Sequence, residues 1–326
     1  MLSDRLPLVL SGQPVPARVV VIRPRAHDDL SAFEGAQVQV VTGFKPDFDH
    51  FDRLGFGARV DIEGTFDLAV VCVPRAKAQA RALIAAASAC AGSVIVDGQK
   101  TDGIDSITKD IKKRAESIEV VSKAHGKSVR FSGGDFSDWA DTGPLSVIDG
   151  FETRLGVFSA DRIDKASALL VETLPAKLPQ TLADLGAGWG FLSRHILTRD
   201  AVTELHVVEA ERAAIDCARA NVSDPRAQFH WADATTFKPP HLLGGVIMNP
   251  PFHTSRAADP SLGQAFIAAA AGMLAPNGQL WLVANRQLPY EAALTAHFAR
   301  TTEIGGNAGF KVLHAEKPFR NGRGRV

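Results

Sequence analysis

The feature that most constrains the fold of this chain is the alternation of short apolar runs with longer segments of helical spacing. Residues 66–74 and 204–209 are apolar runs of strand length, and a helical pattern follows each of them. Such alternation is typical of an α/β fold with a mostly parallel sheet. It continues through both halves of the 326 residues, a length sufficient for two domains with separate cores.

The pattern predicts a definite set of elements. In the first half we expect strands at 17–24, 36–41, 66–74, 92–98 and 118–123, and helices at 75–90 and 105–116. In the second half we expect strands at 181–186, 204–209, 227–233, 245–249, 278–285, 301–306 and 309–317, and helices at 160–175, 189–198, 210–222, 262–274 and 289–299. Between residues 138 and 150 the periodicity is lost and turn residues are frequent. We therefore expect one domain at 1–145 and another at 146–326.

The two halves repeat the same order of elements. Residues 66–77 correspond to 243–254, and an alanine-rich helix follows each segment. The strand at 92–99 then corresponds to 278–286, and residues 124–131 correspond to 307–315. This order favours a duplication over coincidence, and hence two tandem domains of one fold. We assign Val73 to the place of Asn249.

Composition limits the class of protein. The 36 basic and 36 acidic side chains give a formal net charge of zero, so binding to nucleic acid would require local basic patches. A small-molecule or protein substrate is equally compatible with that charge. The three cysteines have no CxxC spacing, which argues against a zinc site or a disulfide framework and fits a reducing cytoplasm. No apolar run is long enough for a signal peptide or a membrane span.

A glycine-rich turn follows the first strand of the second half. In the segment LADLGAGWGFLS, Asp184 ends the strand, and Gly186, Gly188 and Gly190 precede the helix. Glycines at such a turn let backbone N–H groups approach a ligand closely. Position 191 is phenylalanine where the dinucleotide fingerprint has its third glycine. The spacing therefore favours a ligand without a pyrophosphate, such as S-adenosylmethionine, over a turn with no ligand.

Two acidic residues end the next two strands. Glu209 could accept hydrogen bonds from the two hydroxyl groups of a ribose, whereas Glu211 is interpreted as a surface residue. Asp233 could accept from an adenine amino group while the Ala234 N–H donates to the ring. Taken alone, Glu209 would be an ordinary acid at a helix N-terminus and Asp233 an ordinary turn residue.

The run NPPFH, residues 249–253, ends a further strand. Its two prolines cannot donate hydrogen bonds to a sheet, so they stop the strand and hold Asn249 on a stiff backbone. Asp184, Glu209, Asp233 and Asn249 thus all stand at the carboxyl ends of predicted strands. Open α/β sheets bind their ligands at that edge, so the combination favours a ligand site.

Residues 151–316 resemble the class I S-adenosylmethionine-dependent methyltransferases. The segments GVFSADRIDKASALLVETLP, LADLGAGWGFLS, NPPFH and FKVLHA are similar, more narrowly, to the RsmC-type guanine-N2 methyltransferases of bacterial ribosomal RNA. The resemblance implies two tandem Rossmann-like methyltransferase domains, with a seven-stranded, mostly parallel sheet in the second and a degenerate copy in the first. Trp189 departs from the small residue that the family often has in the glycine loop, and we assign it no role.

The resemblance implies methyl transfer from S-adenosylmethionine to the exocyclic N2 of a guanine in the 16S ribosomal RNA of the small subunit. The Asn249 side-chain oxygen and the Pro250 carbonyl would accept the two N–H bonds of the amine, and Phe252 would stack on the flipped base. Pro251 and His253 would complete the substrate contacts, although a lone histidine is as often structural. The reaction needs no metal.

Basic residues are the candidates for further contacts with RNA. In the first half they are Lys109, Lys112, Lys113 and Arg114, with Arg23, Arg25, His27 and Arg75 near predicted strand ends; at the carboxyl end they are Lys311, Lys317, Arg320, Arg323 and Arg325. After its first strand the first half has VIRPRAHDDL, which lacks the glycines of the second half. We therefore expect the first half to bind no cofactor and to recognise RNA or support the catalytic half.

Three alternatives stay open. The same reaction on 23S ribosomal RNA is not well separated from the leading hypothesis. A protein glutamine methyltransferase also uses NPP, usually followed by tyrosine, and Phe252 with His253 argues against it. A non-catalytic RNA-binding protein is disfavoured by the intact Asn249 and glycine loop. The leading hypothesis is a cytoplasmic, monomeric enzyme that binds the small ribosomal subunit or its RNA.

Overall fold

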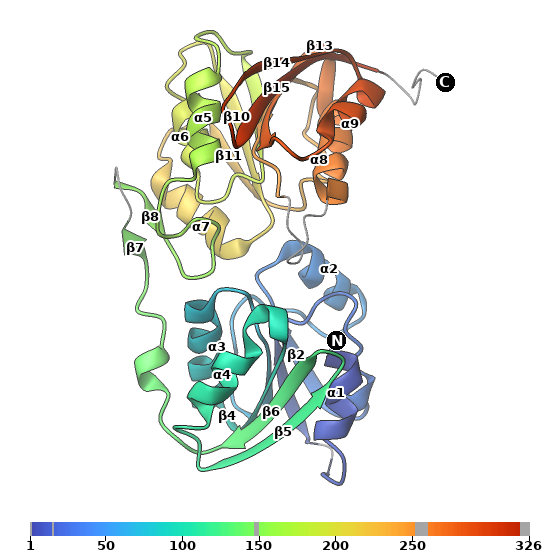
Figure 1. The fold of residues 1–326 in the computed structure, drawn as a ribbon, viewed down its shortest axis with the longest axis vertical. Coiled ribbons are helices and arrows are strands. Elements are labelled where there is room, and N and C mark those ends of the chain that lie inside the picture. Colours follow the sequence, from blue (N-terminus) through green and yellow to red (C-terminus); the bar gives the residue numbers. More distant parts are fainter. Residues whose placement is uncertain (1, 15, 147–149, 252–259, 320–326) are drawn as a thin grey trace. The chain divides into compact units, whose positions relative to one another are not determined.

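The chain divides into two compact units, Met1–Gly143 and Pro144–Val326, and each is considered by itself (Figure 1). The structure is a computed structural model. It describes residues 2–14, 16–146, 150–251 and 260–319.

The first unit is built around a six-stranded sheet with the strand order β2-β1-β3-β4-β6-β5. β6 is antiparallel to both β4 and β5, and the other pairs are parallel. Its elements are α1 (Leu2–Val9), β1 (Arg18–Ile22), η1 (Ser31–Phe33), β2 (Gln37–Val41), α2 (Lys45–Arg53), β3 (Phe66–Cys72), α3 (Lys77–Cys90), β4 (Ala91–Gln99), η2 (Lys100–Asp102), α4 (Ile104–Ile111), β5 (Ser117–Lys123), β6 (Gly126–Ser132) and η3 (Ser137–Trp139).

The second unit is built around a seven-stranded sheet with the order β11-β10-β9-β12-β13-β15-β14, in which β15 is antiparallel to both β13 and β14 and the other pairs are parallel. A short pair of strands, β7 (Leu145–Ser146) and β8 (Glu152–Thr153), precedes it. Its other elements are α5 (Lys165–Thr173), β9 (Thr181–Leu185), α6 (Phe191–Ile196), β10 (Glu204–Glu209), α7 (Arg212–Asn221), β11 (Ala227–Trp231), β12 (Leu243–Met248), α8 (Pro260–Met273), β13 (Leu274–Asn285), α9 (Tyr290–His297), β14 (Phe298–Gly306) and β15 (Phe310–Pro318).

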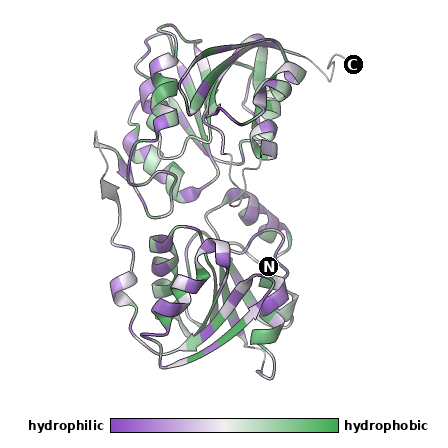
Figure 2. Cartoon of the chain, viewed as in Figure 1, coloured by the Kyte–Doolittle hydropathy of each residue, from purple (hydrophilic) through white to green (hydrophobic). Residues whose placement is uncertain are grey.

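Each sheet is covered by helices on both faces. In the second unit, side chains of α5, α6 and α7 form one cluster with one face of the strands, and α8 and α9 form another with the opposite face. The first unit has the same two-sided core, with α3 and α4 on one face and α1 and α2 on the other. Burial on both faces explains why the central strands are nearly continuous apolar runs, which Figure 2 shows in both units. The predicted α/β fold is confirmed.

The two units repeat one topology, as the order of elements predicts. If β1, β2, β3, β4, β5 and β6 are matched to β9, β10, β12, β13, β14 and β15, the first sheet has the strand order of the second without β11. A remnant of that missing strand is present, because Arg59 forms a parallel bridge with Val41 on the outer side of β2, where β11 pairs with β10. The first unit is therefore a second methyltransferase-like sheet that lacks one edge strand.

The match extends to single residues. Gly186 follows β9 with a φ of 72°, and its N–H donates to the carbonyl of Val208 at 2.9 Å. Arg23 follows β1 with a φ of 58°, and its N–H donates to Val41 at 2.7 Å, the residue that matches Val208. The left-handed turn is thus kept, but an arginine side chain stands where the second unit has a bare backbone.

The strand register corrects one residue of the proposed alignment. Met248 pairs with Leu282 of β13, and the matching pair in the first sheet is Val71 with Val96. Asn249, the residue after Met248, therefore corresponds to Cys72, and the earlier assignment of Val73 to this place is wrong by one position. Cys72 brings a thiol, a weak hydrogen-bond acceptor, to the place of the amide.

Candidate active site

A pocket lies at the carboxyl ends of β9 and β12, the edge at which an open α/β sheet binds ligands. The glycine loop, the segment before α5 and the end of β12 all contribute to it. Its lining residues are Phe158, Ser159, Asp164, Ser167, Gly186, Ala187, Gly188, Trp189, Phe191, Leu192 and Asn249. The structure thus brings the first two glycines of the loop and Asn249 together, as the sequence predicts.

The glycines of the loop differ in what they do. Gly188 has a φ of 56°, and a Cβ atom added to it would meet no atom within 4 Å, so its backbone faces open space at the pocket. Gly190 has a φ of 90° and precedes α6. A Cβ atom there would lie 3.1–3.2 Å from Val222 and Ala218, so this glycine permits the close approach of α7. Gly188 therefore leaves open backbone at the pocket, whereas Gly190 serves the packing of the loop.

Asp184 supports the loop from beneath and does not reach the pocket. Its side chain is fully buried, and the Ser193 hydroxyl of α6 donates to its carboxylate at 2.6 Å. Burial raises the pKa of Asp184 to about 7; the hydrogen bond from Ser193 opposes this rise and the nearby Glu209 adds to it. We therefore interpret Asp184 as a positioning residue that joins β9 to α6, and not as the direct cofactor contact that the sequence suggests.

Glu209 joins the end of β10 to the glycine loop. One carboxylate oxygen accepts the Gly188 N–H at 2.8 Å and the other accepts the Glu211 N–H at 2.8 Å. Burial raises the pKa of Glu209, whereas the two backbone donors favour its ionised form. Each oxygen keeps a further lone pair, so the carboxylate can still accept from a ligand hydroxyl beside Gly188.

Replacing Glu209 with alanine is expected to weaken cofactor binding about tenfold to a hundredfold, the loss of one or two charge-assisted hydrogen bonds. The matched control is Glu211→Ala, because Glu209 accepts from the backbone N–H of Glu211, and alanine keeps that N–H. Isothermal titration with S-adenosylmethionine measures both. Equal affinities for the two variants would contradict the role given to Glu209.

Asp233 stands in a turn two residues beyond β11, opposite the end of β10. Its Oδ1 accepts from the backbone N–H of Thr235 at 2.8 Å and from its hydroxyl at 2.7 Å. Ala234 is buried. Neither residue is among the lining residues of the pocket. The adenine contact predicted for them therefore stays a prediction, and it would have to use the second carboxylate oxygen of Asp233.

The amide of Asn249 has a fixed orientation. Its Nδ2 donates to Asp164 Oδ2 at 3.0 Å and to Ser167 Oγ at 2.9 Å. A carboxylate can only accept, so the NH₂ side of the amide must face Asp164. The side-chain oxygen of Asn249 is thereby left as an acceptor at the pocket.

Asp164 and Ser167 are functional residues that the motif analysis missed. Asp164 caps the N-terminus of α5 by accepting the Ser167 N–H at 2.8 Å, and the same oxygen accepts from Asn249. The spacing of an aspartate three residues before a serine at a helix start signals such a cap. It does not reveal that the cap also contacts a strand end more than eighty residues away in sequence.

Replacing Asp164 with asparagine is expected to lower kcat by about tenfold to a hundredfold, the value of one charge-assisted hydrogen bond. Asparagine caps a helix as well as aspartate does, so α5 and the thermal stability should be kept. An amide, however, does not force the NH₂ group of Asn249 toward it. A loss of melting temperature that parallels the loss of kcat would assign Asp164 to folding alone.

Trp189 packs beneath the loop and ties two segments of the site together. It is 4% exposed, its ring centroid lies 4.9 Å from that of Phe151, and its Nε1–H donates to the Phe158 carbonyl at 2.9 Å. Phe158 itself exposes 59% of its surface at the pocket. The unusual tryptophan therefore fixes the GVFS segment, residues 156–159, against the glycine loop.

The NPPFH run is described only in part. Pro250 is buried, and Pro251 is exposed with its ring near Gly186, since a Cβ added to that glycine would lie 4.0 Å from Pro251 Cδ. The prolines therefore lie beside the glycine loop. Phe252 and His253 fall outside the described residues, and their predicted contacts stay predictions.

Lys311 has a structural role and not the substrate contact predicted for it. Its side chain is buried within the second unit, and its ammonium group donates to the Leu288 carbonyl at 2.8 Å and to the Glu291 carboxylate at 2.5 Å. A buried ammonium group requires such partners. Because the side chain is buried, it has no surface to offer to RNA. Of the other basic candidates at the carboxyl end, residues 320–326 fall outside the described residues.

Comparisons with known proteins agree with this geometry. Residues 150–314 match the model of the family described as "Methyltransferase small domain". Ribosomal RNA small subunit methyltransferase C of Shewanella sediminis is 27% identical over 79% of this chain and 79% of its own. The protein of that name from Aeromonas hydrophila is 28% identical, over 81% of this chain and 79% of its own.

A solved structure shares the fold of the whole chain. It is the Thermus thermophilus 16S rRNA N2 G1207 methyltransferase in complex with AdoMet and guanosine, with a TM-score of 0.80 and 24% identity over 97% of this chain and 91% of that chain. The strand order and the strand-end pocket define the second unit as an α/β methyltransferase domain. The chain belongs to the methyltransferase small domain family.

Within the described ranges, no helix is long and apolar enough to cross a membrane.

Proposed function

We propose that this protein transfers a methyl group from S-adenosylmethionine to the exocyclic N2 of a guanine in the 16S RNA of the small ribosomal subunit. The observation that carries the proposal is the Asn249 amide, which lines the pocket and whose NH₂ group is held by Asp164 and Ser167, so that its oxygen remains as an acceptor. An aromatic amine has two N–H groups to donate and a lone pair delocalised into its ring. An acceptor oxygen in the pocket suits such an amine. The relatives named for small-subunit RNA support the choice of RNA.

The residues of the pocket fit the cofactor. Gly188 presents open backbone at the pocket, which Asn249 also lines. Glu209 is not among the lining residues, but it accepts the Gly188 N–H and keeps spare lone pairs beside it. S-adenosylmethionine, when bound, supplies a methyl group on a positively charged sulfur. The carboxylate of Glu209 would hold the ribose hydroxyls, and the loop backbone would hold the remainder of the ligand.

The residues of the chain would act by orienting the acceptor. The Asn249 oxygen and the Pro250 carbonyl would accept the two N–H bonds of the guanine amine, which aligns the nitrogen and stabilises the positive charge that grows on it. The two prolines keep both acceptors still. Phe252 would stack on the flipped base, which offsets part of its unstacking cost. The exposed Phe158 offers a second aromatic surface at the pocket.

The direct test supplies RNA that lacks the modification. Small and large ribosomal subunits, and their naked RNAs, are prepared from cells without this protein and incubated with tritiated S-adenosylmethionine. Label on the N2 of one guanine of 16S RNA is the expected result, found by mapping the modified base. Label on 23S RNA would select the alternative substrate, and label on a protein glutamine would refute the proposal.

We further propose that the first unit binds no cofactor and positions the RNA. An arginine replaces Gly186 and a cysteine replaces Asn249 in the matching places of its sheet. At this strand edge Arg25 is 51% exposed and only distantly paired with Asp47 at 3.4 Å, while His27 and Arg75 are exposed. Exposed arginines suit phosphate contacts, which position a nucleic acid without reading its sequence.

The other basic candidates of the first unit differ in how available they are for RNA. Arg114 donates two hydrogen bonds to the Asp138 carboxylate at 2.5 and 2.9 Å, and it stacks on Trp139. Lys109, Lys112 and Lys113 are exposed.

The proposal also places the enzyme in the cytoplasm as a monomer. Sedimentation of the purified protein measures its oligomeric state.

A further inference from the structure

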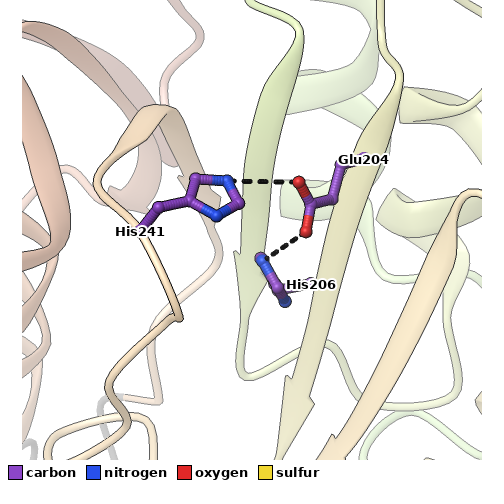
Figure 3. Close-up of side chains that lie close together, drawn as sticks. All are labelled: Glu204, His206 and His241. Carbon is purple, nitrogen blue, oxygen red and sulfur yellow. Dashed lines mark ion pairs between the residues drawn. The ribbon is translucent and has the colours of Figure 1, made fainter.

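A cluster of one glutamate and two histidines lies away from the pocket, at the start of β10. Glu204 and His206 come from β10, and His241 comes from the segment between β11 and β12 (Figure 3). One ligand atom from each residue lies within 4.8 Å of the other two. Figure 3 shows the two imidazole rings facing the two oxygens of the Glu204 carboxylate.

The contacts within the cluster are short but poorly shaped for hydrogen bonds. His206 Nε2 lies 3.2 Å from Glu204 Oε1, and His241 Nε2 lies 3.2 Å from Glu204 Oε2. The His206 side chain is fully buried, yet its Nε2 atom makes no hydrogen bond. A buried polar atom without a partner is costly, which indicates that something else satisfies it.

We propose that Glu204, His206 and His241 bind a Zn²⁺ ion. Two ligands of a tetrahedral zinc ion, each about 2.0–2.1 Å from the metal, lie about 3.3 Å apart. Each imidazole nitrogen lies 3.2 Å from a different oxygen of the Glu204 carboxylate, close to this spacing, and the carboxylate would turn to present one of the two oxygens to the ion. Two imidazole nitrogens and one carboxylate oxygen form a donor set that zinc accepts, and water can complete the tetrahedron because the His241 side chain is 47% exposed.

The surroundings of the cluster resemble the outer shell of a metal site. The other ring nitrogen of His206, Nδ1, lies 3.0 Å from His230 Nε2. With the proton on Nδ1, His206 donates to His230 and keeps the Nε2 lone pair for the metal, so that His230 takes the place of the carboxylate, carbonyl or water that usually holds a ligating histidine. Gln228 donates to Glu204 Oε1 at 3.0 Å and so fixes the carboxylate.

The site would be structural and separate from methyl transfer. Glu204 begins β10 and Glu209 ends it, so the cluster and the glycine loop are about 17 Å apart along the strand, at about 3.3 Å per residue. A metal held here would fasten the segment between β11 and β12 to the sheet. Asp233 stands at the start of that segment, between Trp231 and Leu243.

The experiment uses the full-length protein after treatment with a chelator and dialysis. Titration with Zn²⁺ is expected to show one saturable site per chain, and Co²⁺ is expected to give the visible bands of a tetrahedral complex. His241→Ala and Glu204→Gln should each weaken Zn²⁺ binding tenfold or more. Zn²⁺ should raise the melting temperature of the wild type but not that of His241→Ala.

The matched control is His297→Ala, which removes a partly exposed histidine from α9 of the same unit and should leave the affinity for Zn²⁺ unchanged. His241 is the informative position because its side chain is exposed, so its loss should not prevent folding. The proposal fails if the wild type shows no saturable binding. It also fails if His241→Ala binds Zn²⁺ with unchanged affinity, or if blocking the three cysteines abolishes binding, since the metal would then be held elsewhere.

Discussion

Replacing Asn249 with alanine is expected to abolish methyl transfer while the dissociation constant for S-adenosylmethionine stays within a few-fold of the wild-type value. The reason lies in the orientation of the amide. Asp164 and Ser167 take up its NH₂ group, and the oxygen that remains is the acceptor proposed for the guanine amine. Alanine removes that acceptor but leaves the glycine loop and Glu209, the residues proposed to hold the cofactor, in place.

Single-turnover assays with saturating cofactor measure the chemical step, and calorimetry measures the affinity. Asn249→Asp is an informative second variant. Aspartate at position 249 keeps an acceptor oxygen and the size of the side chain. It also puts a carboxylate oxygen in the place of Nδ2, which lies 3.0 Å from Asp164 Oδ2. The repulsion between the two carboxylates should displace the side chain. Near-normal turnover in Asn249→Ala would show that the amide does not orient the substrate, and the function proposed for the pocket would lose its support.

The sequence predicts most of the fold because the central strands are buried on both faces and carry an unbroken apolar signal. It misses α1 and α2 of the first unit. α2, with the sequence KPDFDHFDR, buries only Asp47 and Phe51, so its apolar stripe is too narrow to stand out from a loop. The counterpart of β11 in the first unit is reduced to a single bridge between Arg59 and Val41, and one bridge produces no recognisable pattern in the sequence.

The site was predictable to the extent that strand ends define it. Gly186, Gly188 and Asn249 reach one pocket because parallel strands bring their carboxyl ends to one edge. Three things depend on tertiary contacts that no local pattern encodes. Asp184 turns into the core toward Ser193, Lys311 is buried against Glu291, and Asp164 reaches Asn249 from another element. The zinc cluster was hidden for the same reason, because no CxxC or histidine repeat joins its residues in sequence.

Removal of the first unit is expected to separate cofactor binding from RNA binding. A fragment of residues 144–326 contains the whole seven-stranded sheet, both of its core clusters and the pocket. We expect it to fold and to bind S-adenosylmethionine as the full chain does. Its kcat/KM for the RNA should fall tenfold or more because the proposed phosphate contacts of the first unit are gone. The fall should appear as a higher KM for the RNA, with kcat nearly unchanged.

A fragment that fails to fold would point to a packing role for the first unit, so the RNA role needs a test in the intact chain. Arg75→Glu reverses an exposed charge at the strand edge of the first sheet without touching either core. It should weaken RNA binding and lower the slope of log affinity against log salt by about 1, the signature of one lost phosphate contact. Arg53→Glu on α2, an equally exposed reversal, is the control for a general change of charge. If both variants bind RNA alike, or if the fragment methylates as fast as the full chain, the first unit does not position the substrate. Its retained turn at Arg23 would then be only a relic of the duplication.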